Sequence, residues 1–210
     1  RDRILDQIRA EEGSTPEHVA RLISQMKPPW KLPDPISETP GMYQLSVPAF
    51  DNGPEIQYLV QLPPEYDPYR RYPTIVTLHA SGTDPALQID WWAGGRTENG
   101  MRLGQASRHG YIVIAPAWTK PSQRTYEYSA REHAAVLDSL RDAYRRFAVD
   151  VDRVYLSGHA MGADAAWDLG IAHPDLWAGV IPIAGTSDRY TNFYWENARY
   201  VPMYFVGGEM

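Results

Sequence analysis

The stretch VYLSGHAMGADAAWDLG, residues 154–170, decides how this chain should fold. Residues 154–156 form a short apolar run typical of a buried strand, and residues 163–169 have the composition of a helix. Between them, two glycines flank Ala160 with the spacing of a G-x-S-x-G turn, in which a strand bends sharply into a helix. Alanine stands where that turn carries its serine.

The turn requires glycine at these two positions for a steric reason. A sharp strand-to-helix bend crowds the backbone on both sides of its apex, and glycine has no Cβ to clash. The apex residue is expected in a strained conformation that costs about 1–3 kcal/mol. Such strain makes sense where it presents a reactive group. We therefore favour a serine replaced by alanine at position 160, over a natural non-catalytic relative. A third interpretation, in which the glycines only allow close packing of strand and helix, is less consistent with the intact motif.

The surrounding pattern alternates strands and helices. Two segments look like a hairpin, followed by short apolar runs that suit strands covered on both faces, as in a parallel sheet. The expected strands are residues 43–47, 56–62, 74–79, 111–115, 154–156, 179–184 and 203–206, and the expected helices are 126–147 and 161–172. This order predicts an α/β fold with a mostly parallel sheet and helices on both faces, whose ligands gather at the carboxyl ends of the strands.

The domain organisation is predicted from a change in composition near residue 40. Residues 1–40 look like a helical and proline-rich leader, with five prolines between residues 28 and 40. Residues 41–210 carry the strand and helix pattern and are expected to form one α/β domain.

Composition excludes several classes of function. The formal charge of −6 argues against nucleic-acid binding, which needs clustered lysine and arginine. The absence of cysteine excludes disulfides, a thiolate metal site and a cysteine nucleophile. Histidines and carboxylates show no metal-binding spacing, and no phosphate-binding glycine loop is present, so we expect no cofactor. No apolar run has the roughly 20 residues of a membrane span, and we identify no signal peptide in this sequence, so the compartment stays undetermined.

A second segment is expected to lie beside the turn at Ala160. The sequence TLHASG, residues 77–82, closes the first central strand, where a loop could stabilise an oxyanion with a backbone N–H. We predict Ser81 as that donor, with Ala80 as the alternative, and Met161 as the second donor. His79 is expected to hold the loop by hydrogen bonds.

These residues, from Tyr43 to Met210, resemble the α/β-hydrolase superfamily. The resemblance is to its esterase and predicted-peptidase group, which includes polyhydroxyalkanoate depolymerase-like and feruloyl-esterase-like proteins. It rests on residues 79–82, on the strand 111–115 with Pro116, on the lead into the turn at 152–159, and on the tail at 202–210. Alanine at positions 80 and 160 departs from the family pattern.

The resemblance implies a serine hydrolase of carboxylic esters with a Ser-His-Asp triad, here an inactive form with Ala160 at the nucleophile position. In that family the acid and the base follow the strand equivalent to residues 202–206, so we expect them, with the remaining C-terminal part of the fold, beyond residue 210. The expected partner is a small or polymeric ester. A peptidase with the same fold and a non-catalytic binding protein remain alternatives.

Candidates for the remaining roles lie in connecting segments. Asp188, after the strand 179–184, is a possible internal acid, although a turn-forming role is the simpler interpretation. Trp118, His159 and Tyr190 are predicted to line the substrate pocket, because aromatic rings near the carboxyl ends of strands can bind flat groups. No histidine within the chain is a convincing base.

Overall fold

The computed structural model describes residues 3, 6–7, 10, 15–36, 39–50, 53–186 and 193–208. Its centre is a six-stranded sheet in the order β1-β2-β4-β3-β5-β6. β2 pairs antiparallel with β1 and β4, and the pairs β3–β4, β3–β5 and β5–β6 are parallel. The strands are β1 (Met42–Val47), β2 (Ile56–Gln61), β3 (Tyr72–Leu78), β4 (Ile112–Pro116), β5 (Val149–His159) and β6 (Gly179–Ile183).

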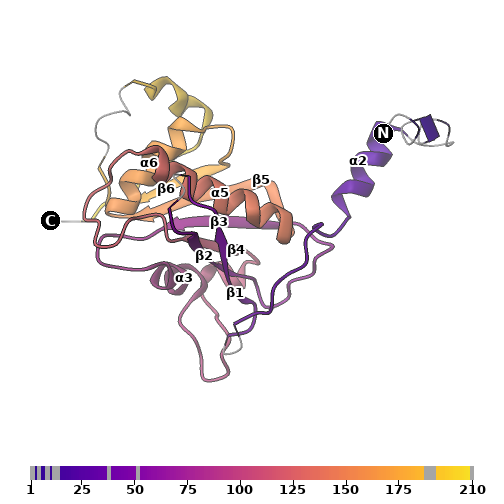
Figure 1. Cartoon of the computed structure of the whole chain (residues 1–210), viewed down its shortest axis with the longest axis horizontal. Helices are drawn as coiled ribbons and strands as arrows, with labels where there is room; N and C mark the ends of the chain where they lie inside the picture. Colours follow the sequence, from indigo (N-terminus) through magenta and orange to yellow (C-terminus); the bar gives the residue numbers. More distant parts are fainter. Residues whose placement is uncertain are drawn as a thin grey trace.

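Helices cover both faces of the sheet (Figure 1), as the strand and helix alternation predicts. Two hydrophobic clusters lie on its two sides. The larger one joins β-strand side chains to the long helices α5 and α6, and the smaller one joins them to α3 and α4. The helices are α2 (Pro16–Ser24), α3 (Pro85–Ala93), α4 (Gln105–Arg108), α5 (Ala130–Arg146), α6 (Met161–Ala172) and the 3₁₀ helix η2 (Trp195–Tyr200).

Local sequence explains where the helices begin. Ser129 caps α5 in a capping box with Glu132, and the helix ends at Arg146, before the extended C-cap residue Phe147. α3 begins at Pro85 after the N-cap Asp84, whose side chain accepts a hydrogen bond from the Leu87 N–H. The sequence pattern did not predict α3 and α4, and the long helix predicted from residue 126 begins at Ala130.

The tail of the described chain differs from expectation. In place of a strand over residues 203–206, the structure has two isolated parallel bridges, from Val180 to Met203 and from Ile183 to Val206. Exposure explains the difference, because Tyr204, Phe205 and Val206 are all exposed, so this segment has no cover on its outer side.

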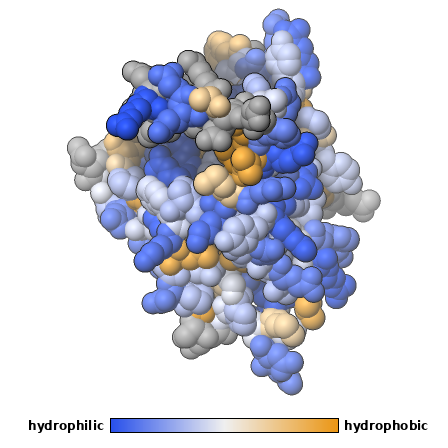
Figure 2. Space-filling view, turned by 90° about the vertical axis from the view of Figure 1, so that its right-hand side faces the viewer, coloured by the Kyte–Doolittle hydropathy of each residue, from blue (hydrophilic) through white to orange (hydrophobic). Residues whose placement is uncertain are grey.

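The leader makes several contacts with the domain. Trp30 stacks against the guanidinium groups of Arg145 and Arg146, 5.1 and 5.0 Å from its ring centre. Arg71, before β3, donates hydrogen bonds to backbone oxygens at the end of α2. α2 itself has no buried residue and extends away from the sheet (Figure 1). The surface seen in Figure 2 is mostly hydrophilic, with smaller hydrophobic patches.

Candidate active site

The turn at Ala160 joins β5 to α6 at the carboxyl edge of the sheet. Ala160 adopts φ 47° and ψ −114°, a conformation that non-glycine residues rarely adopt, and its side chain is exposed. Its backbone N–H donates to the Ile183 carbonyl at 2.9 Å, and its carbonyl accepts the N–H groups of Ala163 and Asp164. The backbone therefore holds this residue from both sides and presents its methyl group outward.

The two glycines of the turn cannot carry a side chain. A Cβ on Gly158 would lie 2.1 Å from the Gly162 carbonyl oxygen. A Cβ on Gly162 would lie 2.3 Å from the Leu78 carbonyl oxygen and 2.8 Å from that of His79. Gly162 thus lets the first turn of α6 approach the end of β3, which brings the turn and the loop after β3 together.

The loop after β3 lies beside the turn because β3 and β5 are parallel neighbours, with Leu78 opposite Gly158. His79 donates through Nδ1 to the Ala80 carbonyl at 3.0 Å, and the Thr83 hydroxyl donates to the same oxygen at 2.9 Å. Burial lowers the pKa of His79 below its usual value. His79 is nearly buried and bound to its own loop, in the way the sequence analysis expected of a structural histidine.

The sequence predicted two oxyanion donors, Met161 and either Ser81 or Ala80, and all three residues lie at one edge of the sheet. Met161 is the first residue of α6, where the backbone N–H has no partner within the helix. Ala80 and Ser81 leave β3 at the height where Ala160 and Met161 leave β5. The Ser81 hydroxyl donates to the Gln123 carbonyl at 3.3 Å, so the side chain is used to fix the loop.

His159 faces helix α3. Its Nδ1 donates to Gln88 Oε1 at 3.1 Å, and its ring meets Trp91 edge-on with 4.5 Å between ring centres. Thr77 on β3 donates to the same Gln88 oxygen at 2.7 Å. Burial lowers the pKa of His159. The side chain therefore links the turn to β3 and α3, and its predicted role in a substrate pocket stays a prediction.

The structure corrects the role predicted for Trp118. This side chain is fully buried, with its ring between His79 and Tyr126 at centroid distances of 5.8 and 5.9 Å. It belongs to the core beneath the loop and offers no surface to a ligand. The other two candidates from connecting segments, Asp188 and Tyr190, lie outside the described residues.

A cavity of about 360 Å³ lies next to the turn, and the sequence analysis did not find it. Three segments form it: the loop after β4, the first turn of α6 and the end of β6. Its lining residues are Arg124, Thr125, Tyr126, Tyr128, Met161, Asp164 and Thr186. All of them except Met161 carry a charged or hydroxyl-bearing side chain, so the wall beside the turn is polar.

A buried carboxylate holds the loop after β4. Glu132 on α5 is 1% exposed and accepts hydrogen bonds from the Glu127 and Ser129 N–H groups and from the Gln123 side chain. Within this loop, Ser122 and Tyr128 have positive φ angles of 61° and 56°. Glu132 therefore stabilises strained backbone that forms the pocket wall and, through Gln123, reaches the Ser81 loop.

A second polar cluster lies behind this wall. Asp168 on α6 is 3% exposed and accepts hydrogen bonds from His133, Tyr126 and Tyr194. Burial alone would raise the pKa of Asp168, but these hydrogen bonds outweigh it and the pKa is lowered. The same burial and the Asp168 charge raise the pKa of Tyr126. This cluster joins α5, α6 and the segment before η2, and it holds the Tyr126 ring in the pocket wall.

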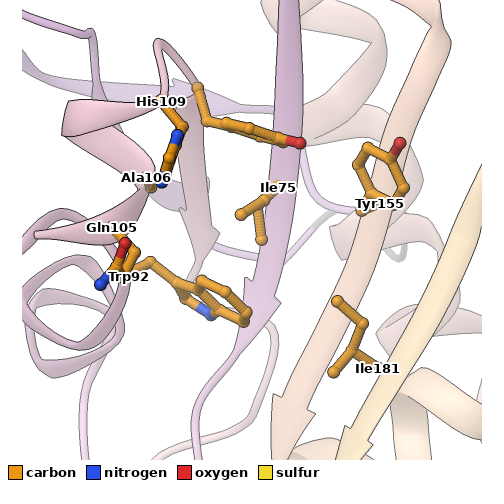
Figure 3. A pocket seen from close by; sticks show the side chains of 8 residues that line it. Ile75, Trp92, Gln105, Ala106, His109, Tyr155 and Ile181 are labelled. Atoms are coloured by element: carbon orange, nitrogen blue, oxygen red, sulfur yellow. The ribbon is translucent and has the colours of Figure 1, made fainter. Parts of the chain in front are cut away.

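A different hollow, of about 300 Å³, lies on the face of the sheet that carries α3 and α4. Figure 3 shows Trp92 on one side of it and Tyr155 and Ile181, from neighbouring strands, on the other. Its lining is mostly apolar and includes none of the residues of the turn. Among the described residues, no group of three or more histidines, aspartates or glutamates is arranged to hold a metal ion.

Comparison with known proteins identifies the family. The model of the Esterase family matches residues 52–204 of the chain. No curated protein matches. In the part of the chain that the structure describes, no helix has the length and apolar character needed to cross a membrane.

Solved structures share the fold. A thermostable esterase superposes with a TM-score of 0.61 at 24% identity, over 80% of this chain and 46% of its own. A serine-to-alanine mutant of the feruloyl esterase module from Clostridium thermocellum, complexed with sinapinate, has a TM-score of 0.60 at 16% identity, over 86% of this chain and 71% of its own. An S-formylglutathione hydrolase from Staphylococcus aureus has a TM-score of 0.55 at 15% identity, over 75% and 66%. The chain thus spans about half the length of the thermostable esterase.

Proposed function

Because this chain belongs to the Esterase family, we propose that it hydrolyses carboxylic esters when serine occupies position 160, and that Ala160 disables it. The observation that carries the proposal is the conformation of Ala160. An exposed alanine with φ 47°, fixed by Ile183 and by the first turn of α6, costs stability and gains no contact from it. Strained backbone of this kind is typical of positions that present a reactive group, here a side-chain oxygen.

With serine at position 160, its Oγ attacks the ester carbonyl carbon and gives its proton to a histidine base. The carbonyl oxygen becomes an oxyanion, for which the N–H groups of Met161 and of Ser81, or alternatively Ala80, are the donors. The bond to the alcohol then breaks, the base returns the proton to the leaving oxygen, and water hydrolyses the acyl-serine. We propose that the base and its acidic partner come from sequence beyond residue 210.

The test is to restore the serine. In the complete protein, which would supply the proposed base and acid, Ala160→Ser should raise the turnover of phenyl acetate by up to about 10⁶, the size of effect known for loss of a triad nucleophile. Ala184→Ser is a matched control, because Ala184 is also an exposed alanine with positive φ, at 54°, one residue past β6. It should gain nothing. Equal activity of the two variants, at the level of the Ala160 protein, would refute the proposal.

Ala160 itself favours a second candidate, a binding protein that keeps the pocket without catalysis. For that protein, Ala160→Ser would leave hydrolysis at background, while binding of an ester at the pocket would persist. A peptidase would show itself in the restored enzyme through measurable turnover of acetanilide, which an esterase would leave at background while it hydrolyses phenyl acetate.

A further inference from the structure

Helix α2 in the leader has an apolar stripe that stays exposed. Val19, Leu22, Ile23 and Met26 recur at the spacing of one helix face, and the last three are 65%, 59% and 61% exposed. The helix buries no residue, so this stripe contributes nothing to the core of the domain. Apolar side chains gathered on one exposed face are typical of a surface that binds a partner.

The contacts of the leader hold α2 so that part of the stripe points away from the domain. The hydrogen bonds from Arg71 and the stacking of Trp30 fix the end of α2 and the segment after it. A groove of about 530 Å³ separates α2 from the domain, and the helix contributes Ala20, Ile23 and Ser24 to its lining. Leu22 and Met26 lie outside this groove, on a helix that extends away from the sheet (Figure 1).

Basic residues accompany the stripe. Arg21 lies in α2, and Lys27 and Lys31 follow the helix, whereas Glu17 is the one acidic residue between positions 15 and 32. The whole chain has a formal charge of −6 and only three lysines, so positive charge is concentrated in this segment. All three basic side chains are exposed, and within the part of the chain that the structure describes none of them forms an ion pair.

The size and charge of this surface favour a lipid bilayer over a second copy of the chain. A stable dimer takes about 20–30 residues from each copy, and a two-fold axis through the stripe would bring its basic residues against themselves. A bilayer surface needs no shaped pocket. It accepts the apolar side of an amphipathic helix below the headgroups, and anionic lipids attract the neighbouring lysines and arginines. Trp30, which is 44% exposed, is of a residue type enriched at the bilayer–water boundary.

We propose that α2 and the residues up to Lys31 bind the surface of an anionic lipid bilayer. Leu22 and Met26 enter below the headgroups, and Arg21, Lys27 and Lys31 lie at the level of the phosphates. This inference does not depend on the proposed ester hydrolysis.

Bilayer binding through α2 would also set the orientation of the domain. The leader contacts the domain before β3 and at the end of α5, which is the amino edge of the sheet. Ala160 follows β5 at the opposite edge, and the 11 residues of β5 span about 30 Å. The turn at Ala160 therefore faces water, and its substrate arrives from solution.

Vesicle flotation tests the basic residues. The chain should partition onto vesicles of phosphatidylcholine with phosphatidylserine at least about tenfold more strongly than onto phosphatidylcholine alone. Lys27→Gln and Lys31→Gln should each lower partition onto the anionic vesicles about fivefold, the equivalent of about 1 kcal/mol per basic residue. Lys120→Gln is the matched control, because Lys120 lies outside the leader and pairs with Glu127, and it should leave partition unchanged.

Leu22→Asp tests the stripe. A carboxylate at this position would have to enter the bilayer, so partition onto the anionic vesicles should fall at least about tenfold, while Tm should not change because α2 buries no residue. Leu87→Asp is the control, since Leu87 is also an exposed helical leucine, 51% exposed in α3. Equal partition onto the two vesicle types, or equal partition of the two leucine variants, would overturn the proposal. A dimer in light scattering that Leu22→Asp dissociates would assign the stripe to a second copy and overturn it as well.

Discussion

Gly162→Ala should separate the turn from the loop after β3. The added Cβ would lie 2.3 Å from the Leu78 carbonyl oxygen, where ordinary contact begins near 3.4 Å, so the two backbones must part by about 1 Å. A displacement of that size at a catalytic centre typically costs about 100-fold in rate. Because the clash is with backbone on a central strand, the free energy of unfolding should also fall, by about 3 kcal/mol.

The assay is phenyl acetate hydrolysis by the Ala160→Ser protein with and without Gly162→Ala, together with thermal unfolding of both. The expected loss is about 100-fold in kcat/KM and about 6–12 °C in Tm, at about 2–4 °C per kcal/mol for a chain of this size. Gly95→Ala is the matched control, since its Cβ would meet nothing within 4 Å and its φ is not in the positive range. If Gly162→Ala behaved like Gly95→Ala in both assays, the close approach of α6 to β3 would not be the feature that assembles the site.

Three further predictions concern the elements around the site. Stability should fall as pH falls. The folded-state pKa of His173 is lowered by burial and by the charge of His133, so the unfolded chain binds the extra proton below about pH 6.5. The lowered pKa of Asp168 adds a second loss below about pH 4, and urea unfolding at about pH 7.5, 5.5, 4 and 3 would reveal both losses. A midpoint that rose on acidification would contradict both. Glu132→Ala should lower Tm and raise KM by releasing the loop after β4. Glu132→Gln can still accept hydrogen bonds in the capping box, so its Tm and KM should stay close to those of the protein with Glu132. Equal changes in the two variants would show that only the charge of Glu132 matters. Ala160→Gly should raise the free energy of unfolding by about 1 kcal/mol because glycine tolerates positive φ, while Ala134→Gly within α5 should lower it by about as much, and calorimetry compares the two directly.

The parts of the fold that the sequence predicted are those with local causes. The helix after the turn runs over Met161–Ala172, as expected, because the glycine spacing fixes its start and His173-Pro174 ends it. β5 is longer than its apolar run, since it begins at Val149, which pairs with Tyr72, and an irregularity before the Thr74–Val154 pair leaves residues 151–153 exposed. α3 was missed although Asp84-Pro85 is a helix start, because its apolar residues Ile89, Trp91 and Trp92 lack a clear helical stripe.

The parts of the site that the sequence did not predict depend on contacts between distant segments. The position of Trp118 after a strand does not determine the direction of its side chain. In the structure the ring is buried in the core, where it packs against His79 and Tyr126. In the sequence, Glu132 looks like one more charged residue on an amphipathic helix. Its hydrogen-bond donors lie between Gln123 and Ser129, and they face Glu132 only because of the path that the chain takes through this loop. A Glu three residues after Ser129 was the available signal, and it marks a capping box and no more.

The turn keeps its shape with alanine at its apex, which shows where its conformation is encoded. The glycines at 158 and 162, the Ile183 carbonyl and the packing of α6 against β5 and β6 hold φ at 47° without help from the side chain at 160. A serine hydroxyl would therefore be added to a backbone already in place, and the strain would be present in either protein. The residue at position 160 can therefore be exchanged to ask about chemistry, while Gly162 must be exchanged to ask about architecture.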